Sequence, residues 1–207
     1  MGKEVVIDGR CYLILNWNKV SALIDSLANK IEARPYKPSL IIGIFRGGMT
    51  VAHLLSDRLG VYNIRGIGAR VYQRIGAIGE KLEIYQPLPL EELRDYDVLI
   101  VEDVVDTGTT YKGILEEEIR HKNPRSLCTA SLHVKPLAKY RPDIYVEETT
   151  CWVCYPWESC EVGRDMYREL LKKHDLETTR KILVEKFEIE PNIVERITES
   201  TSAKKPR

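Results

Sequence analysis

The chain has 207 residues, of which 43% are hydrophobic and 30% charged, with 31 basic and 31 acidic side chains. This length suits one domain with a buried core, and the balanced charge argues against broad electrostatic binding to nucleic acid or anionic membranes. No apolar run approaches the roughly 20 residues of a membrane helix, and the N-terminus does not read as a signal peptide. Five cysteines, an odd number, favour reduced thiols and a cytoplasmic location.

The apolar pattern predicts strands that alternate with helices. Residues 40–45 and 98–101 are apolar without alternation, which is typical of strands buried on both faces of a parallel sheet. Helices are expected over 18–33, 50–59 and 110–121. The other expected strands are 5–7, 12–15, 63–71, 82–85, 127–134 and 144–146. This order predicts an α/β fold with a mainly parallel twisted sheet flanked by helices.

The sequence changes in character after Trp157. Residues 162–171, 179–187 and 193–197 are charged, helix-prone segments. We therefore expect a core over 1–158, a small C-terminal helical appendage over 159–199 and a disordered tail over 200–207.

The most informative segment is VLIVEDVVDTGTT, residues 98–110. An apolar strand leads to Glu102 and Asp103, and the ends of such strands are where α/β sheets bind ligands. The next residues, from Asp106 to Thr110, open onto a helix and offer amides and hydroxyls for a phosphate. Carboxylates beside a phosphate repel it unless a polar or cationic group lies between them, and a ribose with Mg²⁺ suits that position. The alternative of a Walker-B strand lacks its Gly-x-x-x-x-Gly-Lys-Ser/Thr partner.

This segment resembles the 5-phosphoribosyl-1-pyrophosphate (PRPP) motif of type I phosphoribosyltransferases, over about residues 17–158 and nearest to the hypoxanthine/xanthine-guanine branch. The resemblance implies the type I phosphoribosyltransferase fold and a purine salvage enzyme. It would join a purine base to PRPP and release a nucleoside monophosphate and pyrophosphate, with Mg²⁺ as cofactor and a homodimer as the default state. It implies that Glu102 and Asp103 hold the ribose hydroxyls and magnesium, and that Asp106 acts as acid or base beside purine N7. The 5′-phosphate would be bound by residues 106–110, namely Asp106, Thr107, Gly108, Thr109 and Thr110.

Two further segments resemble the family's pyrophosphate site. In Phe45-Arg46-Gly47-Gly48 the glycines allow close backbone approach, and a non-proline cis peptide is common there, so strain is expected at Arg46–Gly47. The alternative is an ordinary strand–helix turn. Arg70 and Tyr72 precede a Gly76/Gly79 loop that would fold over the substrate and exclude water from a cationic transition state. Arg70 would counter charge on the departing pyrophosphate; the alternative is a solvated basic loop.

The base pocket is the third element of the resemblance. Lys135 matches a family lysine that faces the purine 6-substituent, and Trp152 matches an aromatic residue that stacks on the base. The backbone of Val153 would contact the base edge, and Glu158 aligns with an acidic position near metal and pyrophosphate.

The identity of the base rests on two opposing signals. The Lys135 ammonium donor suits a 6-oxo acceptor, which favours hypoxanthine or guanine. The whole-chain layout resembles crenarchaeal adenine phosphoribosyltransferases, with Lys135 turned toward Glu147 or Glu148, and on this resemblance adenine is favoured.

Other classes of function fit the sequence less well. A redox Cys151-x-x-Cys154 pair should open a helix, and a zinc site from Cys151, Cys154 and Cys160 lacks a fourth ligand other than His133. A non-catalytic PRPP-sensing transcriptional regulator would need a basic face or a DNA-binding domain. The balanced composition supplies neither.

Overall fold

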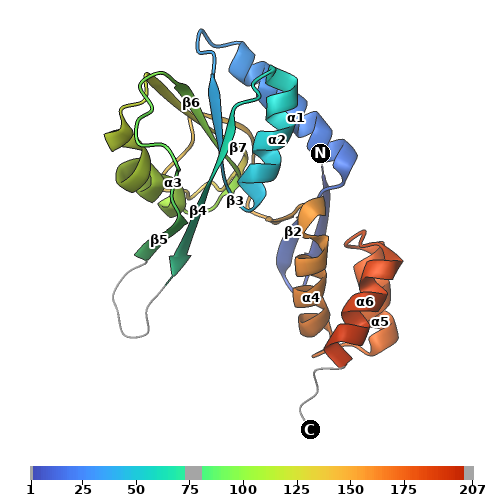
Figure 1. Cartoon of the computed structure of the whole chain (residues 1–207). Helices are drawn as coiled ribbons and strands as arrows, with labels where there is room; N and C mark the ends of the chain where they lie inside the picture. The colour runs from blue at the N-terminus through green and yellow to red at the C-terminus, as the bar shows by residue number, and fades with distance from the viewer. Residues whose placement is uncertain (1, 73–80, 203–207) are drawn as a thin grey trace. The chain divides into compact units, whose positions relative to one another are not determined.

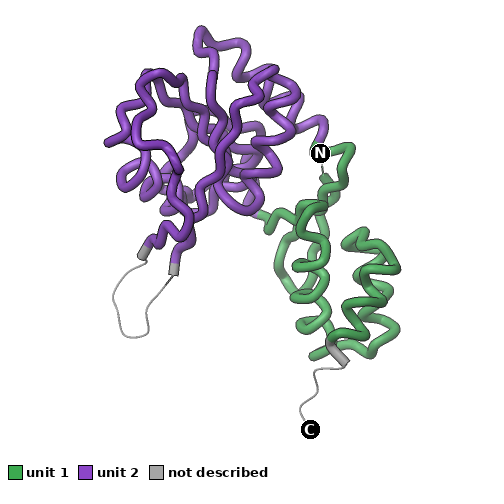
Figure 2. The backbone as a smooth tube through the Cα atoms, viewed as in Figure 1, with its two compact units in different colours: residues 1–20, 151–207 green, residues 21–150 purple. Residues whose placement is uncertain are grey.

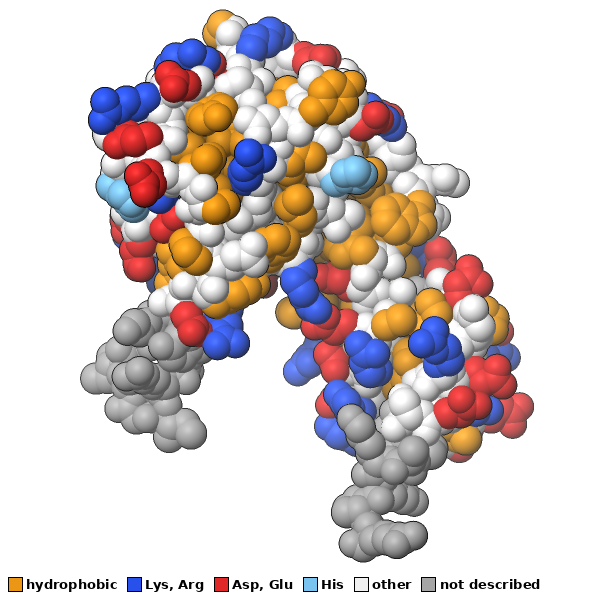
Figure 3. Space-filling model, viewed as in Figure 1, with side chains coloured by type: hydrophobic (Ala, Val, Ile, Leu, Met, Phe, Trp, Pro, Cys, Tyr) orange, Lys and Arg blue, Asp and Glu red, His pale blue; other side chains and the backbone are white. Residues whose placement is uncertain are grey.

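The computed structural model describes residues 2–72 and 81–202. Two compact units divide the chain: residues 21–150 form one, and residues 1–20 together with 151–207 form the other (Figure 2). On the face shown in Figure 3, acidic and basic side chains are interspersed, in agreement with the balanced composition. Among the described residues, no helix combines the length and apolar character needed to span a bilayer.

The larger unit is built on a six-stranded sheet in the order β5-β4-β3-β6-β7-β8. Every neighbouring pair is parallel except β4 and β5, which are antiparallel, so the predicted α/β fold with a mainly parallel sheet is confirmed. The strands are β3 (Leu40–Phe45), β4 (Ile64–Tyr72), β5 (Lys81–Gln86), β6 (Asp97–Val105), β7 (Ser126–Val134) and β8 (Ile144–Glu148).

Helices lie on both faces of this sheet (Figure 1). Helices α1 (Trp17–Glu32) and α2 (Gly47–Leu59) cover one face, and α3 (Thr109–Ile114) lies on the other. The chain continues from α3 as a π-helical turn (Leu115–Ile119) and a 3₁₀ turn (Arg120–Lys122).

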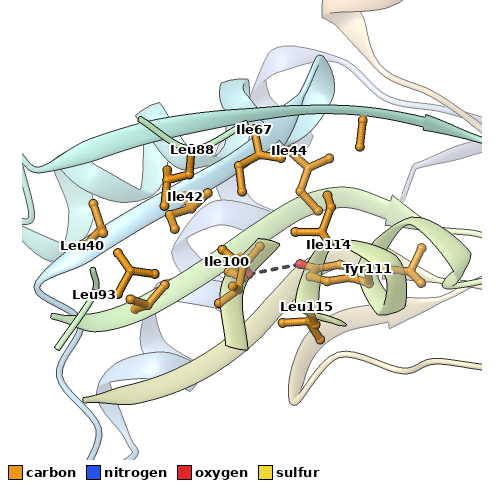
Figure 4. Close-up of a cluster of buried hydrophobic side chains, with 14 of the residues drawn as sticks. Leu40, Ile42, Ile44, Ile67, Leu88, Leu93, Ile100, Tyr111, Ile114 and Leu115 are labelled. Carbon is orange, nitrogen blue, oxygen red and sulfur yellow. Dashed lines mark hydrogen bonds between the residues drawn. The ribbon is translucent and has the colours of Figure 1, made fainter. Parts of the chain in front are cut away.

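The core beneath α3 explains why this helix forms where it does. Ile114 and Leu115 pack with Ile42, Ile44 and other buried sheet residues (Figure 4). The fully buried Tyr111 joins this cluster, and its hydroxyl donates toward two strands, lying 3.1 Å from Ile100 O and 2.6 Å from Ala130 O. Only one of these contacts can use the hydroxyl proton at a time, but together they fix α3 against β6 and β7.

Several observed boundaries differ from the expected ones. Helix α2 begins at Gly47, so the two glycines expected as a break form its first turn. Strand β6 extends through Val105, so Glu102 and Asp103 lie within the strand rather than in the following turn. The backbone partners on β7 explain the extension, because β6 stays in register with β7 as far as Val134.

The smaller unit contains the three-stranded sheet β1-β2-β9 and three helices. Strands β1 (Lys3–Ile7) and β2 (Arg10–Ile14) are antiparallel, and the short β9 (Trp152–Cys154) pairs in parallel with β2. A 3₁₀ turn (Pro156–Glu158) leads to α4 (Ser159–Leu170), α5 (Leu176–Glu185) and α6 (Pro191–Ser202).

The division of the chain differs from the expected boundary at Glu158. Val5, Ile7, Ile14 and Cys154 from the sheet share one core with residues of the helices, such as Met166. The helices therefore bury the N-terminal strands instead of forming a separate appendage. The expected tail begins too early as well, because α6 includes Ser200 to Ser202, whereas residues 203–207 lie outside the described residues.

Candidate active site

The two adjacent acids on β6 face opposite sides of the sheet, because side chains alternate along a strand. The Glu102 side chain lies on the same side of the sheet as Ile100 and interacts electrostatically with Tyr111. Glu102 therefore faces α3. Asp103 is 8% exposed, and its Oδ1 accepts a hydrogen bond of 2.8 Å from the Val104 amide. Burial, followed by the Asp103 and Asp106 carboxylates, raises the pKa of Glu102 well above its ordinary value. A cation or hydroxyl donors at this position would therefore be stabilised.

The segment expected to bind pyrophosphate, Phe45 to Gly48, lies directly against these acids and is called the pyrophosphate loop below. A Cβ atom at Gly47 would fall 1.7 Å from Asp103 Oδ2, and one at Gly48 would fall 2.5 Å from Val101 O. At Gly48 the crowding atoms belong to the backbone, so only glycine fits there without a backbone shift, whereas a side chain at position 47 would have to displace the Asp103 carboxylate or the loop. The peptide bond between Phe45 and Arg46 is cis, one bond before the Arg46–Gly47 position at which strain was expected.

The segment expected to bind the 5′-phosphate, Asp106 to Thr110, bends and then enters α3 at Thr109, and it is called the phosphate loop below. Gly108 has φ 80°, and a Cβ there would lie 2.6 Å from Tyr140 O, so the turn requires glycine for its conformation and for space. The hydroxyls of Thr107 and Thr109 are 2.9 Å apart. Thr107 O accepts a 2.9 Å hydrogen bond from the Lys139 amide. Lys139 and Tyr140 thus support the loop, a role that sequence reasoning missed because no local pattern marks these two residues.

Lys135 lies at the end of β7, next to the start of the phosphate loop. Its amide donates a 2.8 Å hydrogen bond to Val105 O, one residue before Asp106. Burial lowers the pKa of Lys135, and the Asp106 carboxylate acts in the opposite direction. Of the expected alternative partners, Glu147 has its Oε2 3.5 Å from His133 Nε2, and Glu148 pairs with Arg141.

Arg70 lies on β4, where its register partner on β5 is Glu83. The guanidinium Nε donates a 2.6 Å hydrogen bond to Glu83 Oε2, and the guanidinium carbon Cζ lies over the Tyr85 ring, 5.9 Å from its centroid. A pyrophosphate bound to Arg70 would have to compete with Glu83. The expected Gly76/Gly79 loop lies outside the described residues, and the backbone of Tyr72 ends β4.

Two residues expected to contact the base, Trp152 and Val153, belong to the smaller unit, whereas Lys135 belongs to the larger one. Trp152 is 61% exposed and lies beside a cavity of about 290 Å³ that Tyr12 and Glu158 also line. Val153 is buried and pairs with Leu13 in the parallel register of β9 and β2. An exposed indole on a short strand is available to stack on a planar ligand.

The cysteines correct the expectation of reduced thiols. Cys11 and Cys151 form a disulfide, and their Cα atoms are 4.6 Å apart. The pairing arises because Tyr12 and Trp152 are register partners, which brings the residues just before them together. Cys128 and Cys154 are buried free thiols, and burial is the main cause that raises the pKa of Cys154 to about 12.

The sequence raised two sets of metal ligands within the described part of the chain, the cysteines considered for zinc and the acids on β6 expected for magnesium. There, Glu4, Cys11 and Cys151 are the one group of three candidate ligand residues whose ligand atoms converge, and two of these residues form the disulfide. Neither the cysteine set that suggested zinc nor the acids on β6 converge in this way. Mg²⁺ commonly binds one or two carboxylates together with substrate phosphates, so the oxygen donors of Glu102 and Asp103 fit Mg²⁺ bound with a phosphorylated substrate.

Comparison with known proteins decides the family. The profile of the family described as phosphoribosyl transferase domain matches residues 13–167. The chain belongs to this family. Xanthine phosphoribosyltransferase 1 of Saccharomyces cerevisiae is 28% identical over 203 residues, covering 79% of this chain and 97% of the relative. A xanthine-guanine phosphoribosyltransferase of Nitratidesulfovibrio vulgaris (strain DP4) is 29% identical over 131 residues, covering 62% and 73%.

A solved structure agrees with these relatives. The purine phosphoribosyltransferase of Pyrococcus horikoshii is 37% identical, matches with a TM-score of 0.64 and is covered over 93% of its length by 70% of this chain. The predictions of a type I purine phosphoribosyltransferase, of its fold and of an enzyme of the pentosyltransferase class are confirmed. The resemblance to crenarchaeal adenine enzymes stays a prediction.

Proposed function

We propose that this phosphoribosyltransferase transfers the ribose 5-phosphate of PRPP to a 6-oxopurine. The observation that carries the base assignment is the neighbouring position of Lys135 and Asp106. The Lys135 amide donates a hydrogen bond to the carbonyl oxygen of Val105, the residue just before Asp106. The Asp106 carboxylate also interacts electrostatically with the Lys135 ammonium. In a 6-oxopurine, O6 and N7 are adjacent on one edge, so the ammonium would donate to O6 while Asp106 faces N7.

Adenine presents an amino group at the position of O6, and an ammonium cannot accept a hydrogen bond from it. The adenine preference expected from the sequence layout has Lys135 turned away from the base, with Glu147 or Glu148 as candidate partners. Those two carboxylates have His133 and Arg141 as neighbours. The names of the two curated relatives, which act on xanthine or guanine, also support a 6-oxopurine.

In the proposed reaction, base N9 forms a bond to C1′ of the ribose while the bond from C1′ to pyrophosphate breaks. The phosphate loop holds the 5′-phosphate, and Asp106 holds the proton that the purine must lose. Arg46 and the amides of Gly47 and Gly48 would bind the pyrophosphate, with Arg70 countering its charge. Glu102 and Asp103 would hold the ribose hydroxyls and Mg²⁺. The metal would supply charge neutralisation to the leaving group.

Trp152 is proposed to stack on the base, and the Val153 backbone to contact the base edge, with Glu158 as a weaker candidate for metal or pyrophosphate. Magnesium use, a homodimer and a cytoplasmic location stay predictions, as do the individual residue roles. The proposed partners are PRPP, a purine base, the nucleoside monophosphate and pyrophosphate, with no nucleic acid and no membrane.

The test is to incubate the protein with PRPP, Mg²⁺ and each of xanthine, guanine, hypoxanthine and adenine, and to separate the nucleotides by chromatography. We expect kcat/KM to be highest for a 6-oxopurine. A higher value for adenine would overturn the base assignment. Absence of any nucleotide, together with promoter binding in a gel-shift assay, would favour a PRPP-sensing regulator.

A further inference from the structure

Helix α3 contacts β5 through Gly113 and Leu82. A Cβ atom at Gly113 would lie 2.4 Å from Leu82 Cδ2, 3.3 Å from its Cγ and 3.4 Å from its Cβ. Rotation about the Cβ–Cγ bond of Leu82 would move Cδ2 away but would leave Cγ in close contact with the added Cβ atom. Leu82 also packs against the main core cluster, which restricts that rotation. The absence of a side chain at Gly113 therefore sets how closely β5 approaches α3.

From this contact we propose that Gly113 is a positioning residue of the transferase, one that seats the β4–β5 pair against the helix of the phosphate loop. The proposal rests on the proposed function. It links two sets of groups: α3 begins at Thr109, within the phosphate loop, and the β4–β5 pair carries Arg70.

Leu82 is close to Arg70 along the strand pair. In the antiparallel register Leu82 pairs with Val71, and the next pair is Arg70 with Glu83. The Arg70–Glu83 ion pair is therefore the cross-strand pair next to Leu82, the residue that contacts Gly113. A shift of Leu82 away from α3 moves the backbone from which Arg70 extends.

The helix cannot easily give way in place of the strands. The buried Tyr111, two residues before Gly113, fixes α3 through its hydroxyl contacts with β6 and β7. The chain after β5 is fixed too, because Glu118 accepts a 2.9 Å hydrogen bond from the Leu88 amide and pairs with Lys122 at 3.3 Å. We therefore expect an added methyl group at Gly113 to displace Leu82 and, with it, the end of the strand pair that carries this residue.

The experiment is steady-state kinetics of Gly113→Ala with a 6-oxopurine and PRPP. We expect kcat/KM for PRPP to fall about tenfold, because small misplacements of charged groups are costly in group transfer. The KM for the base should change less than about twofold. Alanine is the better helix former, so the thermal midpoint should not fall by more than a few degrees. The double variant Gly113→Ala/Leu82→Ala should recover most of the lost kcat/KM for PRPP.

Gly163 provides a matched control. It lies in α4 of the smaller unit, where a Cβ atom would fall 2.6 Å from Ile197 Cδ1. Gly163→Ala makes the same substitution with a similar crowding, but in the compact unit that does not contain α3, β4 and β5. Its kcat/KM for PRPP should equal that of the wild type.

Unchanged PRPP kinetics in Gly113→Ala would overturn the proposal while leaving the enzyme assignment intact. Loss of activity that Leu82→Ala does not restore would also overturn it, because general damage to α3 would then explain the loss. If the wild type converts no base, the proposed function fails instead. PRPP affinity, measured by calorimetry on the same variants, then tests the role of Gly113 independently of turnover. We expect Gly113→Ala to bind PRPP more weakly and the double variant to recover the affinity.

Discussion

The backbone of Gly47 lies against the Asp103 carboxylate so closely that a Cβ atom would come within 1.7 Å of Oδ2. Any side chain at position 47 must move either the pyrophosphate loop or the acid. We expect Gly47→Ala to weaken PRPP binding in the presence of Mg²⁺ by at least about tenfold, measured by calorimetry. Gly60→Ala is the control, because position 60 has a positive φ of 65° but a Cβ there would meet no atom within 4 Å. It should lose stability, by about 1 kcal/mol, and keep PRPP affinity.

Asp106→Asn separates proton handling from binding. The amide keeps the size of the side chain but cannot take a proton, so we expect kcat to fall about 100-fold while the Kd for PRPP changes less than about threefold. Asp95→Asn, an exposed change elsewhere in the same unit, should leave both unaltered. Binding that collapses in parallel with turnover would contradict the proposed role.

Lys135→Met removes the donor proposed for O6 and keeps the length of the side chain. A hydrogen bond from a charged group contributes about 1.5–3 kcal/mol, so the KM for a 6-oxopurine should rise roughly 10- to 100-fold. The Kd for PRPP should stay near that of the wild type, as it should in the control Lys37→Met. Equal loss of PRPP binding would show that Lys135 supports the phosphate loop rather than the base.

Stability should depend on pH through His133. Burial and, secondarily, Lys135 lower the pKa of this imidazole to about 4, despite the Glu147 oxygen at 3.5 Å. The unfolded chain binds the proton near pH 6.5 and the folded chain only near pH 4. The stability present above pH 6.5 is therefore lost as the pH falls through this window, by roughly 3 kcal/mol in total.

Denaturant unfolding of the wild type and of His133→Gln between about pH 7 and pH 4 measures this effect. The variant should show a shallower decline in the free energy of unfolding across this window than the wild type. His174→Gln, a change at an exposed histidine, should reproduce the wild-type slope. An identical slope in His133→Gln would mean that another group controls the acid response.

The Cys11–Cys151 disulfide closes a loop with a sequence separation of 140 residues. In the chain-entropy model such a loop contributes up to about 5 kcal/mol. Cys11→Ser and Cys151→Ser should therefore lower stability by similar amounts in non-reducing denaturation, and a dithiol reductant should do the same to the wild type. Cys160→Ser should have no comparable effect. A wild type that is insensitive to the reductant, with the bond shown to be broken, would contradict this expectation.

The sequence was sufficient for much of the larger unit. Apolar runs without alternation indicated β3 and the start of β6, and the spacing of acids, glycine and threonines indicated the phosphate loop. Those signals are local, since each is contained within a short segment. The packing of Gly113 on Leu82 and of Tyr140 on Gly108 depends instead on segments far apart along the chain, and nothing in the local pattern specifies such contacts.

The smaller unit was harder to predict for the same reason. Strand β9 has three residues, and its partner β2 lies near the other end of the chain. No local sequence pattern predicts the Cys11–Cys151 pairing or the burial of Val5 and Ile7 by the C-terminal helices. The odd number of cysteines favoured reduced thiols, which was wrong for Cys11 and Cys151.

The division of the smaller unit between both chain ends has a consequence for biosynthesis. Residues 1–20 leave the ribosome well before the residues that complete their core, which begin at Cys151 and extend into α6. The core side chains Val5, Ile7 and Ile14 of β1 and β2 therefore stay uncovered until the residues of α4 to α6 have been translated. The larger unit can complete its own sheet during that interval, because all six of its strands precede residue 150.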